Sequence, residues 1–204
     1  KPFNYDELLL QTKNCIEKTK LTKEIKSLRK MVKDRYGFDN IIGRSNKMEK
    51  VLEQVAKAAD SDSTIVIEGE SGTGKELIAK SSHLASARAD RQFVAINCAA
   101  IPEMLFESEL FGYKKGAFTG ALLDKEGLLY QAQRGTFFLD EISEMSPSMQ
   151  AKLLRVLQEK EFLPVGGRKT IKMDIRFIAT SNKKLKEEVA KGNFREDLFY
   201  RIYV

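Results

Sequence analysis

The sequence predicts an α/β fold, in which helices flank a sheet of parallel strands. Four short apolar runs, rich in β-branched and aromatic residues, are typical of buried strands. Helical patterns follow the first and third runs, as they do where parallel strands are joined by crossover helices. Glycine-rich or polar segments come directly after the strands, at the edge where open α/β sheets bind ligands. The predicted strands are residues 63–67, 92–97, 135–141 and 175–180.

The composition fits one globular domain with an appendage. Of 204 residues, 42% are hydrophobic and 31% are charged, which is ordinary for a soluble protein. No apolar run reaches the ~18 residues of a membrane span, and the two cysteines lack metal-ligand spacing. We therefore expect a cytoplasmic protein with reduced thiols and no membrane contact.

The net charge of +6 is unevenly distributed. Residues 1–36 contain ten Lys or Arg and five Asp or Glu, which gives +5 and leaves +1 for the rest of the chain. A basic surface can bind nucleic acid, but a solvated helical face explains this segment at least as well. The charge therefore does not predict DNA binding by the main domain.

A long helix is predicted from Tyr5 to about Lys33, with Asn4 as its N-cap and acidic residues in its first turn. Its apolar residues could form a short coiled-coil seam or an amphipathic face that lies on the chain's own domain, and both alternatives stay open. Those residues, spaced by four, three and four, are Leu21, Ile25, Leu28 and Val32.

A linker is predicted at residues 36–40, because Gly37 interrupts the helical pattern. The main domain then begins at residue 41. A backbone turn at residues 41–45 could lie against an adenine ring. A second helix is predicted from Asn46 to Ala59, ahead of the first strand.

A glycine-rich loop follows the first strand and opens the next helix. Its glycines allow a sharp turn that aims backbone N–H groups at an anion, and Lys75 adds a positive charge for the β- and γ-phosphates. A plain tight turn is the alternative. Glu76 stands where such loops normally have Ser or Thr. The predicted ATP-binding residues are Gly69, Glu70, Ser71, Gly72, Thr73, Gly74, Lys75 and Glu76.

Polar side chains end the next two strands. Asp140 is placed to hold Mg²⁺, and Glu141 is placed to orient or polarise the attacking water. Alternatively, the two carboxylates only begin the next helix. Asn97 ends the preceding strand and could reach Glu141 across neighbouring strand ends, or it could simply terminate the strand in a turn.

An irregular stretch at residues 111–121 has three glycines, two lysines and two further aromatic residues beyond Phe111. The apolar tip at Phe118 gains nothing from exposure in a monomer, so we expect it to contact a partner. After it, Ser146 and Pro147 predict the start of a helix that ends near Glu159. A hairpin with Gly166 at its turn is predicted over residues 161–170.

The sequence Gly116-Ala117-Phe118-Thr119-Gly120-Ala121 matches the GAFTGA signature of NtrC-like AAA+ activators of sigma-54 RNA polymerase. Residues 69–76, 96–100 and 135–142 resemble that family as well, and Glu normally follows its phosphate-loop lysine. The resemblance runs from about residue 42 to residue 204. Residues 1–12 resemble the end of a response-regulator receiver domain, which leaves residues 13–40 as a linker helix or short coiled coil.

This resemblance implies an AAA+ ATPase that uses ATP and Mg²⁺ to remodel closed promoter complexes, under the control of a two-component receiver. Gly116 to Ala121 would engage sigma-54. Asn97 would switch Glu141 between states, and Asn182 would be the first sensor of the γ-phosphate. Residues 161–170 would be the second pore loop, although a plain surface hairpin is the alternative. Two arginine fingers, Arg195 and Arg201, would reach the active site of a neighbouring subunit.

The implied assembly is a dimer through the linker and a hexameric or heptameric ring when active. Enhancer DNA would be bound only by a further C-terminal domain. We expect the ATPase domain to stop before its helical lid, either because the chain is a fragment or because its source gene is truncated. The alternatives are a different AAA+ remodelling ATPase, or a nucleotide-gated interaction module that does not turn over.

Overall fold

The computed structural model describes residues 5–36, 45–59 and 61–203. The predicted N-cap, most of the predicted linker and the predicted adenine turn lie outside the described residues, apart from Tyr36 and Ser45. Contacts divide the chain after residue 42 into two units, each of which is described by itself. No helix of the described residues is both long and apolar enough to cross a membrane.

The first unit is formed by α1 (Tyr5–Tyr36), a single helix of 32 residues that confirms the predicted helix and extends it by one turn. The four residues of the predicted seam lie on it with roughly half of their surface exposed. Whether this stripe is a coiled-coil seam stays a prediction.

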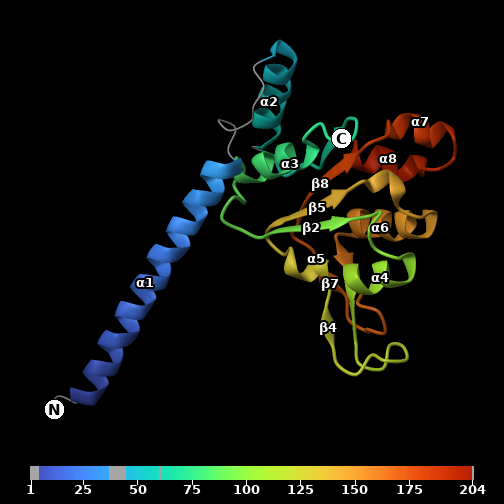
Figure 1. Ribbon diagram of the computed structural model, residues 1–204. Coiled ribbons are helices and arrows are strands. Elements are labelled where there is room, and N and C mark those ends of the chain that lie inside the picture. Colours follow the sequence, from blue (N-terminus) through green and yellow to red (C-terminus); the bar gives the residue numbers. More distant parts are fainter. Residues whose placement is uncertain (1–4, 37–44, 60, 204) are drawn as a thin grey trace. The chain divides into compact units, whose positions relative to one another are not determined.

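The second unit is built on a parallel four-stranded sheet, and it confirms all four predicted strands (Figure 1). The strand order is β1-β8-β5-β2, so that β5 lies between β8 and β2. Asn97 pairs with Asp140 in the register of β2 and β5. The strands are β1 (Ile65–Glu68), β2 (Phe93–Asn97), β5 (Thr136–Asp140) and β8 (Arg176–Ser181).

Helices cover both faces of this sheet. Successive side chains of β5 point to opposite faces, so they pack against different helices. Phe138 packs on one face with Ala79 of α3 (Lys75–Leu84). Phe137 packs on the other face, in the larger core, with Phe106, Leu153 and Leu198. These three residues come from α4 (Glu103–Phe111), α6 (Pro147–Glu159) and α8 (Glu196–Ile202).

Sequence signals fix two helix starts. Ser146 caps α6 by accepting a hydrogen bond from the backbone N–H of Met149, and Pro147 occupies the first turn, as predicted. Gly74 begins α3 in the left-handed region at φ +84°, where glycine carries no Cβ penalty. The phosphate loop therefore leads directly into the first turn of α3.

An arginine holds α2 (Asn46–Ala59) against the amino-terminal end of β8. Arg176 is almost completely buried and donates hydrogen bonds to the carbonyl oxygens of Ala58 (2.5 Å) and Ala59 (3.0 Å). A cation at a helix C-terminus also interacts favourably with the helix dipole. Close by, Arg88 pairs with Asp62 and Asp174. This network joins α2 to the strand that ends beside the phosphate loop.

Smaller elements complete the unit. Two antiparallel hairpins project from one end of the domain (Figure 1). The first pairs β3 (Gly112–Tyr113) with β4 (Lys125–Glu126), and the second pairs β6 (Glu161–Phe162) with β7 (Ile171–Lys172). The remaining elements are α5 (Leu128–Gln131), the 3₁₀ helix η2 (Ile142–Glu144) and α7 (Leu185–Ala190).

Candidate functional site

The predicted phosphate loop has the backbone of an anion cradle. Gly72 and Gly74 both adopt positive φ values, +78° and +84°, which favour glycine. Lys75 folds back over the loop and donates hydrogen bonds of 2.8 Å to the carbonyl oxygens of Gly69 and Glu70. The lysine is half-buried, and the loop stands at the N-terminus of the ten-residue α3. The dipole of α3, the backbone N–H groups of the loop and the Lys75 ammonium therefore all favour an anion at the same place.

Asp140 is held from both neighbouring strands. Its Oδ2 accepts a hydrogen bond of 3.0 Å from the Asn97 amide of β2, and its Oδ1 accepts one of 2.6 Å from the Thr180 hydroxyl of β8. Thr180 also accepts a hydrogen bond of 3.1 Å from the backbone N–H of Glu141. The carboxylate is thus fixed at the carboxyl end of the central strand.

Glu141 leaves the strand in an unusual conformation. Its φ is +54° and its ψ is +49°, in the left-handed region that residues with a Cβ seldom occupy. It precedes the first residue of η2, so the chain turns sharply directly after Asp140. Backbone outliers of this kind are commonly found where strain is stored at functional sites.

The predicted contact between Asn97 and Glu141 is not the one that this structure contains. The Asn97 amide donates to Asp140 instead, and its Oδ1 accepts hydrogen bonds from the backbone N–H groups of Ala99 and Ala100. The physical reason is the strand register, which places Asn97 directly opposite Asp140, while Glu141 has already turned away. The role of Asn97 as a switch remains a prediction.

Asn182 lies at the same edge of the sheet. It is exposed, follows β8 directly and accepts a hydrogen bond of 3.3 Å from the Ser143 hydroxyl of η2. The neighbouring Ser181 carbonyl accepts a hydrogen bond from the backbone N–H of Gly69, at 3.1 Å. The end of β8 is therefore bonded to the start of the phosphate loop. The role of Asn182 as a sensor stays a prediction.

The charges at this edge affect one buried thiol. Burial raises the pKa of Cys98 to about 12, and the negative charges of Asp140 and Glu141 contribute in the same direction. The thiol is therefore neutral and unreactive at physiological pH.

The two predicted arginine fingers do not contact the chain's own phosphate loop. Arg195 is exposed and pairs with Asp197 at 2.6 Å, and this hydrogen bond raises the pKa of Arg195. Arg201 donates a hydrogen bond of 2.7 Å to the carbonyl oxygen of Leu157, near the C-terminus of α6. It lines a cavity of about 380 Å³ with Thr64 and other residues that precede β1 and β8. Arg201 thus lies toward the amino edge of the sheet, opposite the phosphate loop.

The GAFTGA loop, residues 114–124, is a compact hairpin end. Its base is narrow because Gly112 and Gly127 face each other, and a Cβ at either would lie 2.2–2.4 Å from backbone atoms. Within the loop, the Gly116 N–H donates to the Ala121 carbonyl at 2.8 Å. The Phe118 ring lies edge-on to Tyr113, with centroids 4.9 Å apart, and 45% of the side chain is exposed. An apolar group is therefore presented at the tip.

The second hairpin, residues 161–172, is hydrogen-bonded to the base of this loop. Val165 donates from its backbone N–H to the Gly112 carbonyl at 2.9 Å and accepts from the Lys114 N–H at 3.0 Å. Its neighbour Gly166 lies against Ala117. The hairpin is thus not an isolated surface feature, since its turn is bound to the other loop.

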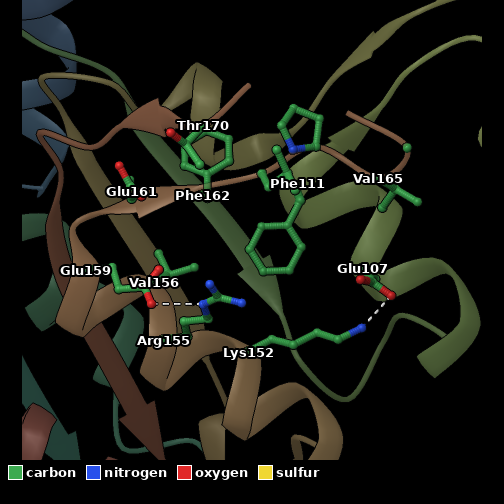
Figure 2. A pocket seen from close by; sticks show the side chains of 13 residues that line it. Glu107, Phe111, Lys152, Arg155, Val156, Glu159, Glu161, Phe162, Val165 and Thr170 are labelled. Carbon is green, nitrogen blue, oxygen red and sulfur yellow. Dashed lines mark hydrogen bonds and ion pairs between the residues drawn. The ribbon is translucent and has the colours of Figure 1, made fainter. Parts of the chain in front are cut away.

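A cavity of about 390 Å³ is lined by residues of α4, α6 and the second hairpin. Figure 2 shows the side chains that line it. The rings of Phe111 and Phe162, 6.4 Å apart, contribute apolar surface to it. Lys152 of α6 pairs with Glu107 of α4 at 2.5 Å along its side. The phosphate loop does not line this cavity, which instead separates the hairpin from the two helices.

Thr180 was missed in the sequence because every residue of β8 is buried, so periodicity does not reveal which side chains face the site. The available signal was chemical. A hydroxyl buried at the carboxyl end of a strand needs a hydrogen-bond partner, and the nearest candidates are the carboxylates of the adjacent strand. Arg176 was missed because the same uniform burial of β8 hides which of its side chains are polar contacts.

Comparison with known proteins gives a consistent assignment. Residues 41–204 match the Sigma-54 interaction domain family. The chain is 54% identical over 178 residues to the Nif-specific regulatory protein of Azotobacter vinelandii, covering 87% of the chain and 34% of that protein. It is 49% identical over 204 residues to the regulatory protein AtoC of Escherichia coli K12, covering 100% of the chain and 44% of AtoC.

A solved structure agrees over the same length. Crystalline NtrX from Brucella abortus in complex with ADP superposes with a TM-score of 0.80 at 38% identity, covering 100% of the chain and 44% of NtrX. NtrX has also been crystallised in complex with ATP, and that structure gives a TM-score of 0.79. The chain thus spans less than half the length of these relatives.

Proposed function

The chain belongs to the sigma-54 interaction domain family, with the AAA+ P-loop fold of sigma-54 activators, and we propose that it is the ATP-hydrolysing core of such an activator. In this proposal, ATP turnover drives the GAFTGA loop against sigma-54 and remodels closed promoter complexes. The observation that carries it is a phosphate loop and two carboxylates at one edge of a sheet whose domain also presents an apolar loop tip.

ATP binds at the edge formed by residues 69–76. The two left-handed glycines and the start of α3 provide N–H donors for the phosphates, and Lys75 adds the cation. The relative NtrX was crystallised with ADP and with ATP, which supports a nucleotide as the ligand here.

Asp140 fits the requirements of a Mg²⁺ ligand. Such ions usually take one or two protein carboxylates together with phosphate oxygens. Both oxygens of Asp140 are held by donors from the flanking strands, Asn97 and Thr180, so the group is oriented before any ion arrives. When bound, Mg²⁺ would offset the charge of the β- and γ-phosphates.

Glu141 is the group that activates water. Its left-handed backbone turns the chain directly after Asp140, and in this proposal the two adjacent acids serve different purposes. A carboxylate beside the γ-phosphate can orient the attacking water and accept its proton. Asn182 at the end of β8 would contact the γ-phosphate.

Turnover requires a second subunit. Arg201 lies toward the sheet edge opposite the phosphate loop, so it cannot serve its own nucleotide without a large rearrangement. In a ring, head-to-tail contacts bring one subunit's amino edge to the next subunit's site. Arg201, with Arg195, would then stabilise the charge of the transferring phosphoryl group.

The hairpins transmit the nucleotide state to sigma-54. Phe118 and Thr119 form the contacting tip, and the second hairpin is bound to the base of that loop through Val165. Since α4 leads directly into β3, a shift of α4 or α6 would move both hairpins together. Control by a receiver domain, dimerisation through α1 and enhancer binding by another domain are further parts of this proposal.

Remodelling of sigma-54 bound to promoter DNA tests the proposal. The chain is mixed with that complex and ATP, and the change in mobility of the complex is recorded beside the rate of ATP hydrolysis. We expect Phe118→Ala to retain hydrolysis and lose remodelling, whereas Lys75→Ala loses both. Remodelling by Phe118→Ala at the wild-type rate would contradict the loop's role.

A further inference from the structure

We propose that Thr180 is a positioning residue that fixes the metal-binding carboxylate of Asp140 and the backbone of Glu141 through a single hydroxyl group. This inference rests on the proposed function, because it assigns Asp140 to Mg²⁺ and Glu141 to water. It adds a residue to which neither the sequence motifs nor the family match assigns a role.

The direction of both hydrogen bonds follows from the groups involved. The backbone N–H of Glu141 can only donate, so the Thr180 oxygen accepts at 3.1 Å. The hydroxyl proton is then available to Asp140, and the 2.6 Å separation from its Oδ1 is typical of a hydroxyl that donates to a carboxylate. Thr180 is completely buried, so water does not replace either bond.

The hydrogen bond from Thr180 to Asp140 sets the orientation of the carboxylate. The carboxylate is otherwise free to rotate about a broad terminal torsion. Thr180 holds Oδ1 from β8, and Asn97 holds Oδ2 from β2, so the plane of the group is fixed from both flanking strands. Partners that orient a metal ligand typically change metal affinity or activity by about 10–100-fold when they are removed.

The hydrogen bond from the Glu141 N–H to Thr180 supports the turn at Glu141. This residue has a φ of +54°, which a residue with a Cβ seldom adopts without support. Its N–H would be left without this partner if the Thr180 hydroxyl were absent. One hydroxyl therefore couples the carboxylate that takes the metal to the backbone that aims the water-activating side chain.

The variants follow from this geometry. Thr180→Val keeps the shape and removes the hydroxyl, so both hydrogen bonds are lost together. Thr180→Ser restores the hydroxyl and loses only a methyl group. Thr136→Val is the matched control, because Thr136 is equally buried and bonds to His83 at 2.8 Å, at the opposite end of β5. If Thr180→Val does not fold, Thr180→Ala removes the same hydroxyl without the branched methyl.

The primary measurement is Mn²⁺ binding to the ADP-loaded chain, followed by electron paramagnetic resonance. We expect Thr180→Val to weaken Mn²⁺ binding by about 10–100-fold, while Thr180→Ser and Thr136→Val stay within about threefold of wild type. Equal Mn²⁺ affinities for Thr180→Val and Thr136→Val would overturn the proposal.

ATP turnover supplies a second readout. At saturating Mg²⁺, Thr180→Val should still have a reduced kcat, because the Glu141 turn has lost its support, whereas Thr180→Ser should recover it. A normal kcat for Thr180→Val at saturating Mg²⁺ would overturn the part that concerns Glu141. A wild-type chain without any turnover would contradict the proposed function, and the Mn²⁺ measurement would still decide the role of Thr180 toward Asp140.

Discussion

Gly166 lies against Ala117, so closely that a Cβ added at Gly166 would come within 2.8 Å of the Ala117 Cβ. These residues belong to different hairpins, and Ala117 is the second residue of the GAFTGA motif. With the backbone hydrogen bonds of Val165, this contact makes the two hairpins one mechanical unit. The contact leaves no room for any side chain at position 166 unless one hairpin moves.

Gly166→Ala should therefore displace the GAFTGA loop and weaken sigma-54 binding. We expect a loss of about tenfold, or ~1.4 kcal/mol, with ATP hydrolysis largely retained because the phosphate loop is not touched. Equilibrium binding to labelled sigma-54 measures the effect.

Gly192→Ala is the matched control. Gly192 has a similar backbone conformation, with φ +75° against +70° for Gly166, but nothing lies within 4 Å of its added Cβ. Both variants carry the cost of a left-handed alanine, about 1–2 kcal/mol. Only in Gly166→Ala does the new Cβ also collide with Ala117. Equal sigma-54 affinities for the two variants would show that the hairpins are not coupled there.

Glu141→Gln should separate binding from hydrolysis. The amide keeps the size of the side chain but does not take a proton from water, so we expect kcat to fall by about 10²–10⁴-fold with little change in ATP affinity. Fluorescent nucleotide titration and phosphate release measure the two quantities. Glu144→Gln is the control, since Glu144 is a nearby carboxylate that pairs with Lys183 at 2.8 Å. A similar loss in both variants would contradict the role of Glu141.

Arg201 should act in a neighbouring subunit. Arg201→Ala and Lys75→Ala should each be inactive alone, whereas an equimolar mixture should recover about a quarter of the wild-type ATPase rate through interfaces that combine the two intact groups. Because Arg201 also binds the Leu157 carbonyl, circular dichroism must first show that Arg201→Ala is folded. A folded mixture that stays inactive would indicate that Arg201 is structural.

Much of this fold could be predicted from the sequence. The four strands are short β-branched runs, and the phosphate loop, the Ser146 cap and the helix at α2 carry strong local signals, so each was placed within a few residues. The short helices α4, α5, α7 and α8 have weaker patterns and were not predicted. Their positions depend on packing against the sheet rather than on local sequence.

The sequence predicted which residues belong to the site, but not which hydrogen bonds join them. Asn97 was expected at Glu141 and instead bonds to Asp140, because strand register is set by tertiary pairing. Thr180 escaped notice because β8 is buried on both faces. The bond between Val165 and Gly112 joins hairpins that are far apart in the sequence, and no local pattern encodes it.

His83 should make the fold sensitive to acid. Burial lowers the pKa of His83 to about 4, with a smaller contribution from the charge of Arg176, while a hydrogen bond to the Arg91 backbone opposes the shift. The neutral ring is thus favoured in the folded state, and the unfolded chain, with a pKa near 6.5, binds the proton more readily. The free energy of unfolding is then unaffected by this residue above pH 6.5 and falls as the pH drops from 6.5 toward 4.

The expected loss is about 3 kcal/mol over that interval, from the difference between the two pKa values. Urea unfolding at pH 7.5, 6, 5 and 4.5 measures it. His83→Gln removes the titration and should flatten the curve in this range, so the difference between the two proteins isolates His83 from the carboxylates. Parallel curves for the two proteins would show that His83 does not contribute.

The most direct test of the central claim is sigma-54 binding as a function of nucleotide state. The chain is loaded with ADP, or with ADP and aluminium fluoride as a mimic of the hydrolysis transition state, and its capture of sigma-54 is measured for wild type and Thr119→Ala. We predict capture only with the mimic and its loss in Thr119→Ala. Absence of capture in every state, with nucleotide occupancy and ring assembly confirmed, would contradict the assignment of this chain as a sigma-54 remodelling ATPase.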